Sequence, residues 1–226
     1  MPGDEERAKE YFDKLAPEYD RAFQKQGRDP LNALVNRFFR GRTFVRRMEL
    51  LEDVLRGLDL GGKSVLDLGC GSGQVSLLAA RLGANVHGVD IAPRMLAIAR
   101  ETAARTGLAE RAHFVEGDVA RAPLEGADVT LLIGVVEYYR DHAALLRRVA
   151  DSARERLVVG HTSRVFYRMA LRRLLFALEG SSLYFHPMTD VIASVEAAGM
   201  RLEREVKEHA FSLLVFRRVR NESGRA

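Results

Sequence analysis

From Lys63 onward, short runs rich in valine and leucine alternate with helical patterns, and this alternation constrains the fold more than any other feature of the chain. Strands are predicted at residues 64–68, 85–89, 112–116, 129–133 and 157–160. Helices are predicted between them, at residues 75–82, 93–106 and 142–152. Because strands separated by helices of this kind pair in parallel, the sequence predicts an α/β fold with a doubly wound sheet.

The two ends of the chain depart from this alternation. Residues 4–58 show a helical pattern, and after the fifth strand helices are predicted at 164–178 and 188–198. A strand hairpin at 200–207 and 210–218 follows. We therefore expect an N-terminal helical arm or lid at residues 1–60, one domain at 61–220 and a flexible tail at 221–226.

Composition narrows the class of protein. The chain has 226 residues, of which 47% are hydrophobic, so it can bury a large core without disulfides. Its single cysteine, Cys70, excludes a disulfide framework and a zinc site built from several cysteines, and no metal is expected. The residues from Met1 to Glu10 are too polar for a signal peptide. These features predict a soluble, cytoplasmic protein, and Cys70 is expected to fill a packing space.

The stretch "SVLDLGCGSGQVSLLAA" joins the first predicted strand to a helix through three glycines, Gly69, Gly71 and Gly73. Glycines are needed where the backbone turns sharply and a ligand approaches it closely. The third glycine comes one residue earlier than in the dinucleotide pattern G-x-G-x-x-G, and Asp67 directly precedes the loop. A carboxylate there is poorly placed for a pyrophosphate and well placed for an ammonium group, as in S-adenosylmethionine (SAM).

Two further acidic residues follow the second and third strands. Asp90 comes 21 residues after Gly69, where a carboxylate can accept hydrogen bonds from both ribose hydroxyls. Asp118, in "EGD", can accept one from the adenine amino group, and Ile91 and Val119 can flank the purine ring. Three acids and three glycines at consistent strand ends indicate a SAM site. The alternative is that these aspartates only cap their own loops.

The motifs "VLDLGCGSG", "VHGVD" and "EGDV" resemble those of class I SAM-dependent methyltransferases. The resemblance covers most of residues 11–218 and implies a Rossmann-like, seven-stranded sheet that is mostly parallel and has an antiparallel last strand. It also implies that residues 133–139, with Gly134, border the methionine half of SAM.

Two other segments resemble particular branches of these enzymes. The N-terminal "YFDKLAPEYD" resembles the opening helix of quinone-type small-molecule methyltransferases, which implies that Tyr11, Phe12 and Tyr19 cover SAM as a lid or dock the helix on the sheet. Residues 162–200 are similar to magnesium-protoporphyrin O-methyltransferases, a family that methylates a propionate carboxylate. That family has a histidine where this chain has Tyr138.

Candidate catalytic residues follow the fourth and fifth strands, at the edge where open α/β sheets bind ligands. They are Glu137, Tyr138, His161 and His186, with Tyr139 and His142 as weaker choices. Methyl transfer from a sulfonium is an in-line displacement, so holding the reactants in place supplies much of the catalysis. A base is required only if the acceptor carries a proton that must leave.

The sequence thus predicts a SAM-dependent methyltransferase acting on a small molecule, on oxygen of an amphipathic or aromatic metabolite, as a monomer or homodimer. RNA, DNA or protein acceptors are the alternative, prompted by a pI near 9.4, although "GVVEYY" lacks the proline motif of amino-directed nucleic-acid methyltransferases. A third alternative is a SAM-binding protein that docks a partner or a membrane surface. Its basis is two arginine-aromatic segments, at residues 36–51 and 163–180.

Overall fold

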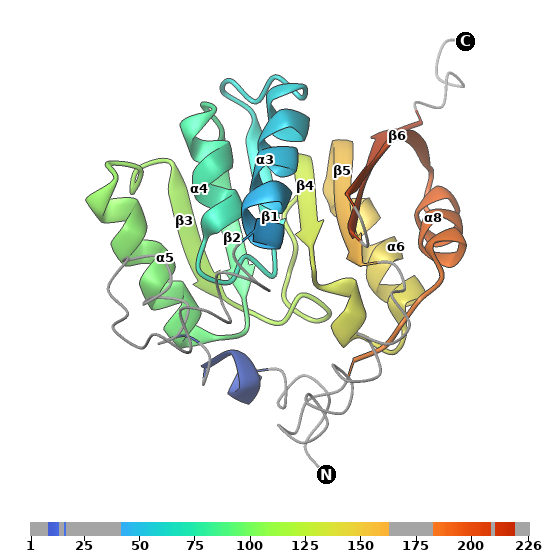
Figure 1. The fold of residues 1–226 in the computed structure, drawn as a ribbon, viewed down its shortest axis with the longest axis horizontal. Coiled ribbons are helices and arrows are strands. Elements are labelled where there is room, and N and C mark those ends of the chain that lie inside the picture. Colours follow the sequence, from blue (N-terminus) through green and yellow to red (C-terminus); the bar gives the residue numbers. More distant parts are fainter. Residues whose placement is uncertain (1–8, 14–15, 17–41, 163–182, 209–210, 220–226) are drawn as a thin grey trace.

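The computed structural model describes residues 9–13, 16, 42–162, 183–208 and 211–219. A seven-stranded sheet in the order β3-β2-β1-β4-β5-β7-β6 forms its centre (Figure 1). The strands are β1 (Ser64–Leu68), β2 (Asn85–Asp90), β3 (Ala112–Glu116), β4 (Ala127–Ile133), β5 (Ala153–Thr162), β6 (Met200–Glu208) and β7 (Phe211–Arg218). Strands β1 to β5 pair in parallel, and β7 pairs antiparallel with β5 and β6. The predicted doubly wound sheet with an antiparallel last strand is confirmed.

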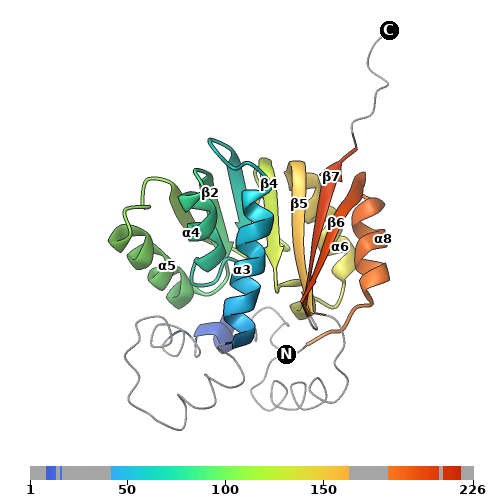
Figure 2. The ribbon, with the colours of Figure 1, turned by 45° about the horizontal axis from the view of Figure 1, so that its top comes forward.

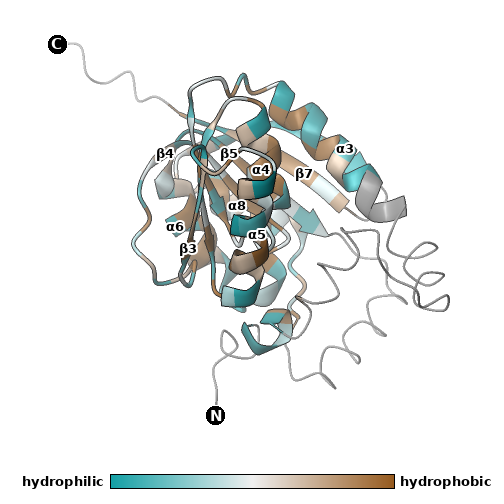
Figure 3. Ribbon diagram, turned by 90° about the vertical axis from the view of Figure 1, so that its left-hand side faces the viewer, coloured by the Kyte–Doolittle hydropathy of each residue, from teal (hydrophilic) through white to brown (hydrophobic). Residues whose placement is uncertain are grey.

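Helices cover both faces of the sheet and bury two separate cores. On one face lie α3 (Arg42–Arg56), α4 (Gln74–Arg81) and α5 (Pro93–Arg105). Helices α4 and α5 pack on β1, β2 and β3, and α3 contacts β6. Figure 2 shows α3 beside α4 on this face, and the two helices are in contact. On the other face, α6 (His142–Ser152) and α8 (Met188–Glu196) pack on β4, β5 and β7. The apolar sides of these helices face the sheet (Figure 3).

Local sequence signals explain where several helices begin. Pro93 opens α5, where its missing N–H is not needed and its fixed φ suits a helix. Asp141 caps α6, and its carboxylate accepts a hydrogen bond from the Ala144 backbone N–H at 3.0 Å. Gly73 precedes α4 with φ 77°, a left-handed conformation that favours glycine.

From residue 61 onward, the described strands and α-helices match their predicted bounds within two residues, apart from the fifth strand, which was predicted too short. The prediction for the fifth strand was residues 157–160, whereas β5 extends over Ala153–Thr162. Its first half is polar, but Arg156 binds Glu203 on β6 at 2.9 Å and Glu155 binds Lys63 at 2.8 Å, so the charged side chains are paired. The helix predicted at 164–178 lies outside the described residues, as does the whole arginine-aromatic segment 163–180. Of the other such segment, 36–51, residues 36–41 lie outside them, and the rest belongs to α3.

A short helical segment at residues 9–13 and 16 lies at the edge where the parallel strands end (Figure 1). Farther along the chain, α3 contributes Leu51, Val54 and Leu55 to the core beneath α4. Within the described part of the chain, no helix has the length and apolar character needed to cross a bilayer.

Candidate functional site

The glycine loop after β1 is held against β2. The backbone N–H groups of Gly69 and Cys70 both donate to the Val89 carbonyl, at 2.7 and 3.1 Å. A side chain at Gly69 would overlap the Val135 side chain, so this glycine serves packing. Gly71 differs, because no described atom lies within 4 Å of the position its Cβ would take, and its φ is 53°. The loop therefore presents open backbone at Gly71, where a ligand can approach.

Asp67 is a buried carboxylate at the end of β1. Only 2% of the residue is exposed, and its Oδ2 accepts a hydrogen bond from the Ser76 hydroxyl of α4 at 2.5 Å. Burial raises its pKa from 3.8 to about 6, and the nearby Asp90 charge adds to the rise. The protein therefore holds a costly negative charge beneath the loop, and a cationic ligand would relieve that cost.

Asp90 closes β2 and binds the glycine loop directly. Its Oδ2 accepts from the Gly71 N–H at 2.7 Å, and its Oδ1 accepts from the Ala92 N–H at 2.9 Å. Burial raises the pKa of this carboxyl too, although the backbone hydrogen bonds oppose the rise. Each carboxylate oxygen has a second lone pair, so Asp90 caps its own loop and keeps capacity to accept from a diol.

Asp118 follows β3 and is anchored through one oxygen. Its Oδ1 accepts from the Ala120 N–H and from the Tyr139 hydroxyl, each at 2.9 Å. Its Oδ2 is buried and accepts no hydrogen bond among the described residues, and the Nε of Arg121 lies 3.7 Å away. Val119 is buried beside it. One carboxylate oxygen is thus left available at the place where the sequence predicted an adenine contact.

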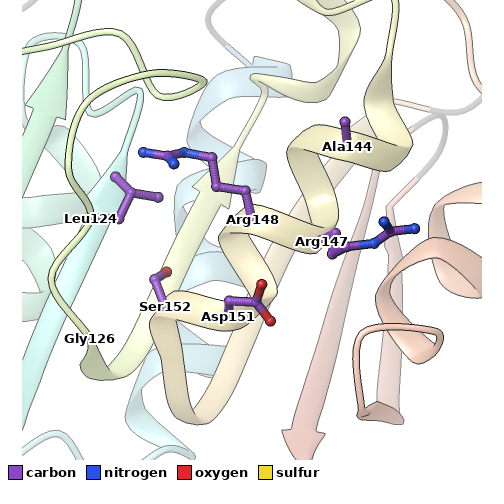
Figure 4. Close-up of a pocket in the computed structure, with 7 residues that line it drawn as sticks. All are labelled: Leu124, Gly126, Ala144, Arg147, Arg148, Asp151 and Ser152. Carbon is purple, nitrogen blue, oxygen red and sulfur yellow. The ribbon is translucent and has the colours of Figure 1, made fainter.

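The loop that carries Asp118 is fixed from outside by α6. Arg148 donates from Nε to the Val119 carbonyl at 3.0 Å and from a terminal nitrogen to the Ala122 carbonyl. This arginine lines a surface groove of about 470 Å³, together with Leu124, Gly126, Ala144, Arg147, Asp151 and Ser152. Figure 4 shows Arg148 reaching toward the loop while Arg147 points away from it. None of the predicted site residues lines the groove. Arg148 instead stabilises the loop after β3 through its hydrogen bonds to the Val119 and Ala122 carbonyls.

A second group of polar residues lies after β4 and β5, and Glu137 is at its centre. This residue belongs to η2 (Val136–Tyr138) and is 6% exposed. Its Oε1 accepts from the Thr162 N–H at 2.9 Å, and its backbone carbonyl accepts from the Tyr184 N–H at 2.7 Å. Glu137 therefore ties together the segment after β4, the end of β5 and the segment before α8. Its Oε2 is buried and has no hydrogen-bond partner among the described residues.

His161 is the neighbour of Glu137 at the end of β5. It is 1% exposed, and neither ring nitrogen has a hydrogen-bond partner among the described residues. Burial lowers the pKa of His161, and the Glu137 charge partly opposes this. The carbonyl of His186 lies near the ring, outside hydrogen-bond geometry. An unpaired buried polar atom costs roughly 1–3 kcal/mol, so Oε2 of Glu137 and the two ring nitrogens of His161 would each gain from binding a polar group of a ligand.

His186 and His142 extend this group toward α6. Their rings stack with centroids 3.9 Å apart, and Nε2 of His186 lies 2.9 Å from the Tyr139 carbonyl. The pKa of His142 is lowered by burial first and by the His186 charge second. The structure thus brings together Glu137, His161 and His186, three of the four predicted catalytic residues.

The fourth, Tyr138, belongs to an aromatic cluster that includes the N-terminal segment. Its ring meets Phe12 edge to face, with centroids 5.2 Å apart, and Phe12 meets Tyr11 in the same way at 5.3 Å. Leu183 and Phe185 complete the cluster. Tyr11 is therefore buried at this edge of the sheet, whereas Tyr19 lies outside the described residues.

The N-terminal segment also contacts the opposite side of the same edge. Asp13 accepts a hydrogen bond from the Arg94 N–H in the first turn of α5 at 3.1 Å. The Nζ of Lys9 lies 2.6 Å from Glu116 at the end of β3. The segment therefore spans from the ends of β2 and β3 to the end of β4, over the loops that carry the predicted site residues.

Comparison with known proteins agrees with this geometry. Residues 65–156 match a family model described as a methyltransferase domain. This match indicates a methyltransferase domain within residues 65–156, which is less than half of the chain. The matched residues begin in β1 and end in β5, and they include all three strand-end aspartates.

Curated relatives share this domain over part of their length. A ribosomal protein L11 methyltransferase of Alteromonas mediterranea is 38% identical over 101 residues, covering 41% of this chain and 35% of that protein. A ubiquinone biosynthesis O-methyltransferase of Cereibacter sphaeroides is 39% identical over 98 residues, covering 43% of this chain and 40% of that protein. The chain thus matches well under half of the length of these relatives.

Solved structures resemble the whole chain. The magnesium protoporphyrin IX methyltransferase of Synechocystis PCC 6803, in its structure with bound SAM, has a TM-score of 0.76 and is 21% identical. The comparison covers 97% of this chain and 99% of that one. At this identity the likeness establishes the fold.

Several residues that shape the site were not predicted from the sequence. They are Ser76, which binds Asp67, Arg148, which holds the Val119 loop, and Thr162, which binds Glu137. Tyr139 was considered only as a catalytic or packing residue, whereas it binds Asp118. Ser76 carries a usable signal, because it is a polar residue among the leucines and alanines of an otherwise apolar helix face. The other contacts depend on how distant segments pack.

Proposed function

We propose that this protein binds SAM at the carboxyl edge of β1 to β4 and transfers its methyl group to a small-molecule acceptor, at oxygen of an amphipathic or aromatic metabolite. The observation that carries this proposal is that Asp67 and Asp90 interact beneath the glycine loop, where Asp90 accepts from the Gly71 N–H and the backbone at Gly71 is open. Asp118 follows the neighbouring strand end, beyond β3. No pyrophosphate is expected there, because the carboxylates would repel it.

The residues around the loop fit SAM well. Burial raises the pKa of Asp67 and of Asp90, so both carboxylates would gain from the ammonium and sulfonium charges of this ligand. Asp67 would face the α-ammonium side, and Asp90 would accept from the ribose hydroxyls. Gly134 also has open backbone and φ 70°, as expected beside the methionine half.

The adenine end would be held by the residues after β2 and β3. Ile91 and Val119 would flank the purine, and Oδ2 of Asp118 would accept from its amino group, which would satisfy an otherwise unpaired buried atom. When bound, SAM supplies an activated methyl group on a sulfonium, so the chain has to hold an acceptor in line with it.

The acceptor side would be formed by Glu137, Tyr138, His161 and His186. The unpaired atoms of Glu137 and His161 support a site for a hydrogen-bonding group of the acceptor. Because burial lowers the pKa of His161, its neutral imidazole would be available to accept a proton, and the Glu137 charge would favour the protonated form. Tyr138, which packs in the aromatic cluster with Tyr11 and Phe12, would line the acceptor site next to these residues.

A small acceptor is favoured by the N-terminal segment. Its contacts with Tyr138 on one side and with Arg94 on the other support a cover over the edge where an acceptor would enter. Such a cover excludes water from the reaction and suits a metabolite better than a folded macromolecule. The resemblance to a ubiquinone biosynthesis O-methyltransferase supports the same choice.

The decisive experiment is transfer of labelled methyl from SAM into an extract of the source organism, separated into organic, polar, protein and nucleic-acid fractions. We expect label in the organic fraction, where mass spectrometry can identify the acceptor. Label in protein or RNA would overturn the small-molecule proposal and would favour the activity class of the relative that methylates ribosomal protein L11. An Asp90→Ala variant assayed in parallel controls for transfer by other enzymes.

A further inference from the structure

Tyr139 occupies a position between the two halves of the site. It follows η2, and its backbone N–H donates to the Val136 carbonyl at 3.2 Å. Its own carbonyl lies 2.9 Å from Nε2 of His186, on the acceptor side. Its hydroxyl donates to Oδ1 of Asp118, on the adenine side, at 2.9 Å. The backbone of this tyrosine is therefore held from two directions while its side chain reaches a third segment.

The contact with Asp118 leaves that carboxylate in one orientation. Oδ1 accepts from both Tyr139 and the Ala120 N–H, so both donors fix the same oxygen. Oδ2 is then the atom without a hydrogen-bond partner among the described residues. Without Tyr139, the carboxylate would keep the Ala120 contact and the longer approach of the exposed Arg121, at 3.7 Å from Oδ2, which holds it less firmly. The tyrosine hydroxyl fixes the carboxylate and keeps Oδ2 ready for a donor.

We propose that Tyr139 is a positioning residue for cofactor recognition, which orients Asp118 so that the site distinguishes a purine bearing a 6-amino group from one that lacks it. This inference rests on the proposed function, because it assigns Asp118 to the adenine of SAM. It adds a residue that acts through Asp118 and touches neither the methyl group nor the acceptor.

The test measures binding of two ligands by calorimetry. One is S-adenosylhomocysteine, and the other is its 6-deamino analogue, in which hydrogen replaces the amino group. A charge-assisted hydrogen bond contributes enough to make the wild-type protein prefer the amino-bearing ligand by about tenfold or more. In Tyr139→Phe we expect this preference to fall to about threefold or less, because the affinity for S-adenosylhomocysteine drops while that for the analogue changes little.

Two further variants distinguish a loss of Asp118 orientation from a nonspecific effect of removing a tyrosine hydroxyl. Tyr184→Phe removes the same type of hydroxyl from a neighbouring tyrosine, whose ring packs under the Arg140 guanidinium at 5.5 Å, and it should keep the wild-type preference. Asp118→Asn should lose the preference by itself. Adding Tyr139→Phe to Asp118→Asn should then have no further effect on the ratio, as expected for two residues that act through one contact.

The outcomes are distinguishable. A wild-type protein that binds neither ligand would overturn the proposed function and this inference with it. A wild-type protein that binds both ligands equally, or a Tyr139→Phe variant that weakens both equally, would overturn the inference and leave SAM binding intact. If Tyr139→Phe does not fold, Asp118→Asn decides whether the carboxylate reads the amino group, and a retained preference in that variant overturns the inference.

Discussion

The two halves of the site are built in opposite ways. At the cofactor edge, the ends of β1 and β2, Asp67 and Asp90 are hydrogen-bonded by groups within 19 residues along the chain, and Asp90 is satisfied by backbone N–H groups. At the acceptor edge, the ends of β4 and β5 with residues 183–187, Glu137 binds a residue 25 positions away and His186 binds one 47 positions away. One edge is a local motif, and the other is assembled by tertiary packing.

The edges also differ in what they leave unpaired. At the cofactor edge, burial raises the pKa values of Asp67 and Asp90, so a nearby positive charge would stabilise their ionised forms. At the acceptor edge, three buried atoms of Glu137 and His161 have no hydrogen-bond partner in the part of the chain that the structure describes. This contrast suggests a cationic ligand for the first edge and a neutral or acidic polar group for the second.

The largest effect on activity is expected from substitutions at the acceptor edge. Glu137→Gln keeps an oxygen for the Thr162 N–H but removes the charge beside His161, and His161→Asn removes the base. If these residues handle a proton of the acceptor, kcat should fall by roughly 10²–10⁴-fold in either variant. Affinity for S-adenosylhomocysteine should stay unchanged, since the cofactor edge is intact.

The measurement is methyl transfer to the acceptor fraction that the wild-type protein labels, together with calorimetric binding of S-adenosylhomocysteine. A loss of less than about threefold in both variants would show that the acceptor needs no base, as expected for a carboxylate acceptor. Loss of cofactor binding instead would show that the two edges are not separate.

The charge deficit at the cofactor edge predicts an unusual pH dependence. The pKa of Asp67 rises from 3.8 to about 6 on folding, so the folded protein binds this proton more tightly than the unfolded chain does. The contribution of Asp67 to the free energy of unfolding is therefore largest below pH 3.8 and is lost as the pH rises through 6. Relative to wild type, Asp67→Asn should gain roughly 3 kcal/mol between those limits.

Denaturant unfolding at several pH values tests this prediction without any ligand. Asp128→Asn is a matched control with the opposite sign, because its Ser64 contacts lower the pKa of Asp128. The wild-type stability that depends on Asp128 is present above its ordinary pKa and is lost as the pH falls. If the free energy of unfolding depends on pH in the same way for wild type and Asp67→Asn, the ionised Asp67 does not destabilise the folded protein and the prediction is wrong.

The assignment of the cofactor edge to SAM can be tested by measuring the affinity of an Asp90 variant for SAM. Asp90→Ala removes both the acceptor for the ribose hydroxyls and the contact with the Gly71 N–H. Affinity for SAM should fall by about tenfold to 100-fold, since hydrogen bonds to a charged group are lost. Calorimetry measures the affinity, and a near-wild-type far-ultraviolet circular dichroism spectrum confirms that the sheet has formed. Undiminished affinity would contradict the assignment of this edge to SAM.

The same contrast explains how much could be predicted from the sequence. The strands at residues 64–68 and 112–116 and the helix at 142–152 were predicted with the bounds that the structure has. Asp67, Asp90 and Asp118 were identified because each lies within two residues of the end of a strand, and parallel strands bring such ends to one edge. These signals are local, so a single sequence contains them.

What was missed depends on contacts between distant segments. The stacking of His142 on His186 and the bond from Tyr139 to Asp118 require knowledge of how residues 183–187 and η2 pack. The short prediction for β5 has a similar cause, because its polar first half is stabilised by ion pairs with Lys63 and Glu203 that no local pattern reveals. The assignment of residues 1–60 as a lid stays a prediction.

The smallest expected effect concerns that lid. Lys9 and Glu116 form an ion pair, but their side chains are 37% and 50% exposed, so the pair contributes little. The segment is held mainly by Tyr11, Phe12 and Ala16, which are packed against both edges. Lys9→Ala should therefore change the release rate of S-adenosylhomocysteine by less than about threefold in stopped-flow measurements. Arg46→Ala breaks a similarly exposed ion pair on α3 and should have no effect on release. A large, salt-dependent effect of Lys9→Ala alone would mean that charge, and not aromatic packing, closes the site.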